Sequence, residues 1–196
     1  MPPSRSRSVW YGALAALILA VDIVTKRLAV ANLLPGVPSH EIFGGLARLT
    51  LGFNTGAAFG MTVGIASRAV FTLLALAILV VLWRLYRETP ESNALRAFAL
   101  TCVMAGATGN LIDRLRWSRG VVDFIDVGLG AHRFWIFNVA DSAVSIGAVL
   151  LAWELLRERS AAEAAGMTAS APAAPSTLVD APIDAGAEAP PRPDEA

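Results

Sequence analysis

The chain has few of the residue types on which soluble enzymes and disulfide-linked proteins depend. Only 16% of its 196 residues are charged, against about 25% in ordinary soluble domains. Its single cysteine, Cys102, excludes an internal disulfide and is typical of a small buried hydrophobe. Neither of the two histidines, His40 and His132, has the spacing of a zinc ligand, which argues against metal catalysis. A formal net charge of zero offers no basic surface for nucleic acid.

Hydrophobic residues, in contrast, make up 55% of the chain, and they gather in four long runs. A helix needs about 20 largely apolar residues to cross a bilayer. The runs cover residues 10–31, 69–85, 94–115 and 134–156. The tryptophans lie at or near the ends of these runs, as indole rings do at membrane interfaces. We therefore predict a mainly α membrane protein with four transmembrane helices.

The first run has a second interpretation. Arg5 and Arg7 precede it, as basic residues precede the apolar part of a cleaved signal peptide. The apolar pattern resumes after Lys26 and Arg27, which favours a retained helix. Basic residues divide almost equally between the two sides of the resulting topology, so the positive-inside rule does not decide its orientation. The N-terminal arginines carry more weight, and we expect both termini in the cytoplasm, with residues 1–9 as the cytoplasmic N-terminus.

Outside the runs, composition separates two further segments. Residues from about 35 to 67 are polar and rich in glycine, with apolar residues interspersed, which predicts short strands joined by turns. They form the predicted β-rich extracytoplasmic segment between the first two helices, within a transmembrane domain of residues 10–159. Residues 160–196 are rich in alanine, proline and acidic residues, so we expect a disordered tail there.

Polar side chains recur at helical spacing inside the runs. The pairs are Asp22 with Lys26, Asn110 with Arg114, and Asn138 with Asp141. Residues three or four apart are neighbours on a helix, and a rise of about 1.5 Å per residue places all three pairs in the outer half of the membrane. Such groups either join helices or take part in chemistry. For the first two pairs both interpretations stay open.

Two aspartates are the strongest candidates for chemistry. Asp141 opens an apolar run, where a carboxylate costs about 2.5–3.5 kcal/mol to insert and usually persists because it has a function. Asp123 lies at an apolar boundary a short distance upstream, and two acids that share one proton can activate water. Asp113 competes with them, but it neighbours Arg114 near a helix end, where an ordinary salt bridge suffices. Asp126 falls in a predicted loop and is expected to be solvated. The residues alone do not select Asp123 over these two.

Five motifs in this chain follow one another in a familiar order. They are Asp22-Ile-Val-Thr-Lys26, Phe53-Asn-Thr-Gly-Ala-Ala-Phe59, Gly106-Ala-Thr-Gly-Asn-Leu-Ile-Asp-Arg114, Val121-Val-Asp-Phe124 and Phe137-Asn-Val-Ala-Asp-Ser142. In order and spacing the chain resembles lipoprotein signal peptidase (signal peptidase II) over residues 10 to 158. The pair Ala107-Thr108 departs slightly from the Gly-Ala or Ala-Leu type expected in the third motif.

This resemblance implies an intramembrane aspartyl protease of the bacterial inner membrane, with its active site toward the outer leaflet. Its substrates would be prolipoproteins with a diacylglyceryl cysteine, cut just before that cysteine. The resemblance implies no metal or organic cofactor, membrane lipids as partners, no nucleic acid, and a monomer. Matching positions make Asp123 and Asp141 the catalytic pair. The supporting or substrate-binding residues would be Asp22, Lys26, Asn54, Gly56, Asn110, Arg114, Asn138 and Ala140.

Two other classes of function remain. A proton- or ion-coupled transporter would also use Asp, Lys and Asn inside the membrane. Transporters usually contain an internal repeat, and none is visible in this sequence. A non-catalytic membrane scaffold would tolerate asparagine at both Asp123 and Asp141.

Overall fold

The computed structural model describes residues 5–55 and 64–169. The elements run in the order α1 (Arg5–Asn32), β1 (Pro38–Ile42), β2 (Ala47–Asn54), α2 (Gly64–Glu88), α3 (Ala94–Arg116), β3 (Val121–Leu129), β4 (His132–Arg133) and α4 (Val139–Ala169). The compact unit that carries the site ends at Ser160. α4 itself extends past residue 160, where the tail was predicted to begin, and residues 170–196 lie outside the described part of the chain.

Three helices within the described residues are long and apolar enough to cross a membrane. They are α2 from Ala69 to Glu88, the whole of α3, and α4 from Val139 to Ala162. The prediction of a mainly helical membrane protein with a small sheet is confirmed to this extent. A fourth span over α1 stays a prediction.

The sheet is assembled from two distant parts of the sequence. Its strands are antiparallel in the order β1-β2-β3-β4. β1 and β2 come from the predicted β-rich segment, but β3 and β4 follow α3, where no strand was predicted. The pairing of β2 with β3 sets Asn54 opposite Val121 and Gly52 opposite Asp123. The sheet thus brings the second and fourth sequence motifs together.

The start of the fourth apolar run was predicted wrongly. Residues 134–138 are not helical, and α4 begins at Val139. Phe137 lies instead alongside β3: its N–H donates to the carbonyl of Ile125, and its carbonyl accepts the N–H groups of Phe124 and Ile125. Because the backbone N–H and carbonyl of Phe137 are already paired with β3, they are not available to a helix. The helix therefore begins only after this residue.

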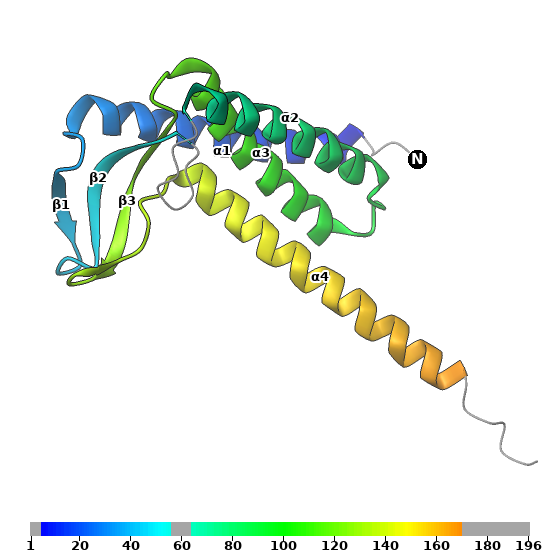
Figure 1. The fold of residues 1–196 in the computed structure, drawn as a ribbon. Helices are drawn as coiled ribbons and strands as arrows, with labels where there is room; N and C mark the ends of the chain where they lie inside the picture. The colour runs from blue at the N-terminus through cyan, green and yellow to red at the C-terminus, as the bar shows by residue number, and fades with distance from the viewer. Residues whose placement is uncertain (1–4, 56–63, 170–196) are drawn as a thin grey trace, which may run out of the picture. The chain divides into compact units, whose positions relative to one another are not determined.

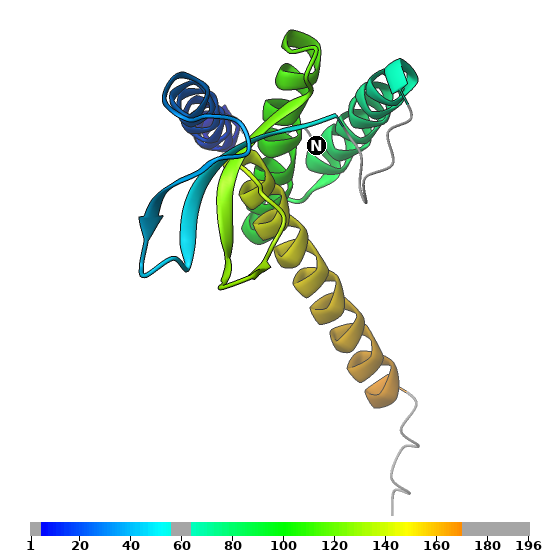
Figure 2. The same ribbon diagram turned by 60° about the vertical axis from the view of Figure 1, so that its left-hand side comes forward.

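α3 lies between the other helices and sets their spacing. It packs against both α1 and α2, and Figure 2 shows these two helices on either side of it. Figure 1 shows the sheet at one end of the helices, away from the N-terminus. A side chain at Gly106 would collide with the backbone of Ala140, and a Cβ at Gly109 would lie 2.6 Å from the Asp22 carboxylate. The two glycines therefore let α3 approach both α4 and α1 closely at the level of the polar motifs.

An apolar cluster fixes the sheet against the end of α1. Ala29 and Leu33 of α1 pack with Leu51 of β2 and with Val122 and Phe124 of β3, and all five are buried. Burial of this area stabilises the fold by about 25 cal/mol per Å² of apolar surface. Because side chains alternate along a strand, burying Val122 and Phe124 against α1 directs Asp123 to the other face of β3.

Candidate active site

Asp123 is a buried acid on β3, with only 4% of its surface exposed. Its Oδ1 accepts a hydrogen bond of 2.7 Å from the amide Nδ2 of Asn138, and Asn54 donates a second one. Burial, together with the negative charge of Asp141, raises the pKa of Asp123 to about 7 from an ordinary value near 4. The hydrogen bonds and the charge of Lys26 offset only part of this rise. Near neutral pH this carboxyl group therefore both holds and releases a proton.

Asp141 lies in the first turn of α4, where it forms a reciprocal cap with Asn138. The Asn138 Oδ1 accepts the Asp141 N–H at 2.8 Å, and the Asp141 Oδ2 accepts the Asn138 N–H at 3.2 Å. This is the hydrogen-bonding pattern of a capping box. The other oxygen, Oδ1, accepts from the amide of Asn110 at 2.7 Å. The carboxylate thus accepts two hydrogen bonds at a helix N-terminus, where the helix dipole favours negative charge.

Asn138 is the residue that joins the two acids. Its side chain is fully buried, and its Nδ2 lies 2.7 Å from Asp123 Oδ1 and 3.1 Å from Asn110 Oδ1. The same amide accepts the backbone N–H of Asp141 through its oxygen. One planar group thus fixes the position of Asp123 relative to the start of α4. The sequence analysis predicted Asn138 as a neighbour of Asp141 and as a supporting residue, but it missed the role of Asn138 as the cap of α4.

Lys26 is the centre of a second polar group, which we call the lysine hub (Asp22, Lys26 and Asp113). The Lys26 Nζ lies 2.8 Å from Asp22, 2.9 Å from Asp113 and 2.9 Å from the Asn110 Oδ1. Three hydrogens serve three acceptors, so the ammonium group has no donor left over. The predicted ion pair of Asp22 with Lys26 is confirmed. The predicted partner of Asp113 was wrong, because Asp113 pairs with Lys26 and not with a neighbouring arginine.

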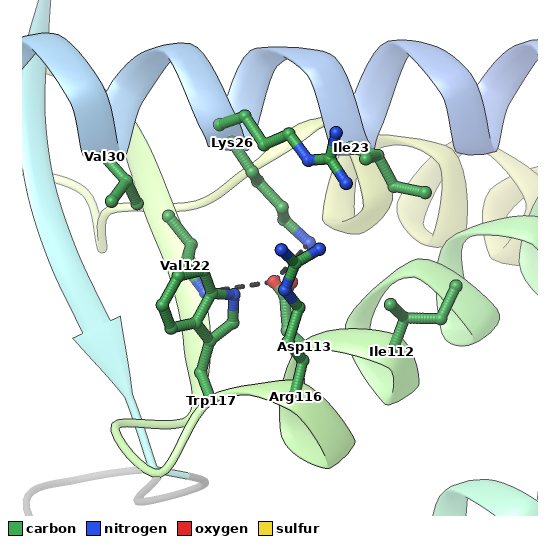
Figure 3. Close-up of a pocket in the computed structure, with 9 residues that line it drawn as sticks. Ile23, Lys26, Val30, Ile112, Asp113, Arg116, Trp117 and Val122 are labelled. Carbon is green, nitrogen blue, oxygen red and sulfur yellow. Dashed lines mark hydrogen bonds and ion pairs between the residues drawn. The ribbon is translucent and has the colours of Figure 1, made fainter.

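The lysine hub holds the backbone on both sides of the two candidate acids. Asp22 accepts the N–H of Ala140 at 2.9 Å, one of the helix-start donors of α4 that has no partner inside the helix. Asp113 accepts the N–H of Val122 at 3.1 Å, next to Asp123 on β3. Figure 3 shows Lys26 reaching from α1 to the Asp113 carboxylate, which also binds Val122. Residues from α1 and α3 therefore position the backbone that carries Asp141 and Asp123.

Arg114 supplies positive charge beside this pair. Its guanidinium donates to the backbone carbonyl of Asn110 at 3.2 Å, and its charge interacts with Asp141, Asp123 and Asp113. Gly56 lies outside the described residues, so its predicted role is not placed. Ala140 is fully buried with its Cβ toward Gly109, which leaves no room for a larger side chain.

Asp126 was predicted to be solvated and in a loop, and both predictions were wrong. It lies on β3 with 5% of its surface exposed, and it accepts from Arg133 Nε at 2.8 Å and from Thr50 Oγ1 at 3.0 Å. Burial alone would raise the pKa of Asp126, but these hydrogen bonds and the charges of Arg133 and Arg48 outweigh it and lower the pKa. Asp126 therefore stays ionised and stabilises the sheet.

Within the described residues, no three His, Cys, Asp or Glu side chains gather closely enough to hold a metal ion. The groups that converge are two aspartates, three asparagines, one lysine and one arginine: Asp123, Asp141, Asn54, Asn110, Asn138, Lys26 and Arg114. Acid–base chemistry on a water molecule is the reaction type that such side chains support.

Known proteins are similar to this chain over most of its length. The family model described as signal peptidase (SPase) II matches residues 14–157. The chain belongs to the signal peptidase II family. The lipoprotein signal peptidase of Desulforapulum autotrophicum is 40% identical over 146 residues, covering 72% of this chain and 88% of the relative. That of Moorella thermoacetica is 37% identical, covering 73% and 90%.

A solved structure of a bacterial membrane enzyme at 2.3 Å resolution superposes with a TM-score of 0.69 at 30% identity, covering 81% of this chain and 93% of that one. The family is a peptidase family, and the expected membership is confirmed.

Asp113 was the main residue missed by sequence reasoning. Its spacing from Gly106, Gly109 and Asn110 follows one helix face, and this pattern was available in the sequence.

Proposed function

We propose that Asp123 and Asp141 are the catalytic dyad of a lipoprotein signal peptidase. The enzyme is an aspartyl endopeptidase that removes signal peptides from prolipoproteins and cuts just before the diacylglyceryl cysteine. The observation that carries this assignment is the Asn138 amide, which donates to the Asp123 carboxyl group and accepts the backbone N–H of Asp141, while burial and Asp141 raise the pKa of Asp123 to about 7. One proton shared between two close carboxyl groups is the arrangement that aspartic proteases use.

In the proposed mechanism the two acids have different tasks. Asp141, ionised at the start of α4, takes a proton from a water molecule, and the resulting hydroxide attacks the scissile carbonyl carbon. Asp123, protonated, donates its proton to the developing oxyanion. The tetrahedral intermediate then collapses: the C–N bond breaks, Asp141 returns its proton to the leaving cysteine nitrogen, and Asp123 recovers its own. Arg114 stabilises the negative charge on the pair during this cycle.

The proposed topology has four transmembrane helices and both termini in the cytoplasm of a bacterial cell with an inner membrane. The dyad and the sheet then lie at the outer leaflet, on a monomeric chain. This placement suits a substrate with two acyl chains, because the chains stay in the bilayer while the peptide bond enters the polar site. A transporter would need no such lateral access, and nothing in the site favours one.

A cleavage assay on a defined substrate tests this function. The purified full chain is incubated with a synthetic prolipoprotein peptide that carries a diacylglyceryl cysteine, and a matched control peptide carries the unmodified cysteine. Mass spectrometry should find one new N-terminus, at the lipidated cysteine, and a chelator should leave the rate unchanged. Cleavage at another bond, equal cleavage of the unmodified peptide, or loss of activity with the chelator would each contradict the proposal.

A further inference from the structure

A cavity of about 70 Å³ lies between α1, α3 and β3, beside the lysine hub. The buried side chains of Lys26 and Asp113 line it together with Arg116 and Trp117 (Figure 3). Arg27, which is exposed, also lines it. Neither Asp123 nor Asp141 contributes to its walls. The cavity is therefore a separate site that the proposed reaction does not use.

The charges that line this cavity are unbalanced. Lys26, Arg27 and Arg116 bring three positive charges against the one negative charge of Asp113, which Lys26 already neutralises. Arg27 and Arg116 are both exposed, and within the described residues no carboxylate lies within salt-bridge distance of either. The guanidinium of Arg116 rests over the Trp117 ring, 5.4 Å from its centre. The cavity thus offers two guanidinium groups to an anion.

Three other arginines near this end of the molecule, Arg48, Arg133 and Arg114, have partners in the fold. Arg48 and Arg133 bind Asp126, and Arg114 binds a backbone carbonyl. In the proposed topology, this end faces outward, where transmembrane proteins carry few arginines in short segments. Because arginines are rare on this side of the membrane, the presence of two in one cavity indicates a binding partner for them. Arginine binds a phosphate group through two parallel hydrogen bonds.

We propose that this cavity binds the phosphate of an anionic phospholipid from the outer leaflet. A volume of about 70 Å³ has room for a phosphate group but not for a whole lipid, since each liquid water occupies about 30 Å³. Leu28 and Leu115, next to the two arginines, are 58% and 61% exposed and offer an apolar surface for the acyl chains. Trp117 suits the headgroup level, because its indole has an apolar body and a polar N–H.

A headgroup bound in this cavity would stabilise the backbone next to the proposed active site. It would hold the ends of α1 and α3 together beside the Asp113 carboxylate, which binds Val122 next to Asp123. Anything that binds only the folded state raises its stability. The anionic lipid is therefore expected to raise the melting temperature of the protein.

The test measures lipid binding directly, with the full chain in neutral detergent. Phosphatidylglycerol and phosphatidylcholine with the same acyl chains are titrated separately, and native mass spectrometry counts the lipid retained while melting is followed in parallel. Each arginine near a lipid surface contributes about a fivefold gain in affinity. Arg116→Gln should weaken phosphatidylglycerol binding about fivefold, and Arg27→Gln/Arg116→Gln roughly 30-fold by the same measure, with loss of the lipid-dependent rise in melting temperature.

Arg119→Gln is the matched control. Arg119 is exposed at the same end and rests over the Phe53 ring at 5.1 Å, but it does not line the cavity. Unchanged binding in Arg119→Gln supports the proposal, whereas equal losses in Arg119→Gln and Arg116→Gln would show diffuse surface charge and overturn it. Full binding in the double variant would overturn it too. Displacement of the lipid by millimolar inorganic phosphate would assign the cavity to free phosphate instead. Because no cleavage is measured, the result is independent of the proposed peptidase function, and only the choice of leaflet rests on it.

Discussion

Two pairs of aspartates in this molecule have the same side-chain chemistry but different surroundings: three of the four are buried, and Asp141 is half-buried. In the lysine hub, Asp22 and Asp113 share the ammonium group of Lys26 and hold backbone N–H groups. In the dyad, the hydrogen bonds to the Asp123 and Asp141 carboxylates come from neutral amide groups, and the charge of Arg114 acts on both acids. A carboxylate beside a lysine is neutralised and serves the structure, whereas one beside another carboxylate keeps a proton within reach of neutral pH. The partner of a buried acid therefore decides its role more than its place along the chain.

The largest expected difference between the pairs is in catalysis. Asp123→Asn and Asp141→Asn should each lower kcat by about 10⁴- to 10⁶-fold, because each removes an acid or a base from the reaction. The double variant should be no slower than the slower single one, since residues that act as a unit are not additive. Initial rates on the lipidated peptide measure this. Asp113→Asn, in the lysine hub, is the matched control and should retain measurable turnover; a loss as deep as that of the dyad variants would erase the distinction.

The second difference is in stability. Lys26→Met leaves two carboxylates buried without their partner, and breaking a buried ion pair costs about 3–5 kcal/mol. The triple variant Asp22→Asn/Lys26→Met/Asp113→Asn carries no stranded charge and should lose less than the single one. Chemical unfolding in detergent compares the two. Equal destabilisation of both variants would show that the lysine acts through its packing and not through its charge.

Asn138 separates capping from catalysis. Asn138→Ala removes the cap of α4 and should cost about 0.5–2 kcal/mol of stability. Asn138→Ser keeps a capping oxygen but loses the amide donor that fixes the position of Asp123, and a small misplacement of a catalytic group can cost about 100-fold in rate. The serine variant should therefore regain most of the stability while kcat stays about 10- to 100-fold low. If serine restored both properties, Asn138 would be a cap and nothing more.

The pH dependence gives the smallest effect. Asp123 acts as the protonated partner, so the rate should fall up to tenfold per pH unit above about 7, the pKa of this group. The same raised pKa means that the folded state holds a proton which the unfolded state releases near pH 4. The stability contributed by this proton is complete below about pH 4 and is lost as the pH rises through 7. In Asp123→Asn this part of the stability profile should be flat, and an unchanged profile would assign the titration to another group.

The fold was predictable where the spacing of apolar or charged residues along the chain indicates a helix. The apolar runs of α2 and α3 and the ion pair of Asp22 with Lys26 follow from local spacing. β3 was not predictable in this way, because its pairing with β2 joins residues that are distant in sequence and its apolar character resembles a helix boundary. The true start of α4 depends on Phe137 pairing with Ile125, which no local pattern shows.

Asp141 was a candidate from its place in an apolar run, but the choice of Asp123 as its partner came from motif resemblance. By charge and spacing alone, Asp113 and Asp126 were equal competitors of Asp123. Only the tertiary structure separates them, because it places a lysine beside one, two arginines beside the other and a second acid beside Asp123. Such partners lie in other elements, so their identity depends on the complete fold.

The most direct measurement of the shared proton is an infrared titration of the purified protein with ¹³C-labelled aspartate carboxyl groups. The wild type should show one protonated carboxyl band that disappears with a midpoint near pH 7. Asp123→Asn should lack this band, and Asp141→Asn should shift its midpoint downward, because the charge that helps to raise the pKa is gone. A wild-type spectrum without a carboxyl group titrating near pH 7, or a band that persists in Asp123→Asn, would contradict the account.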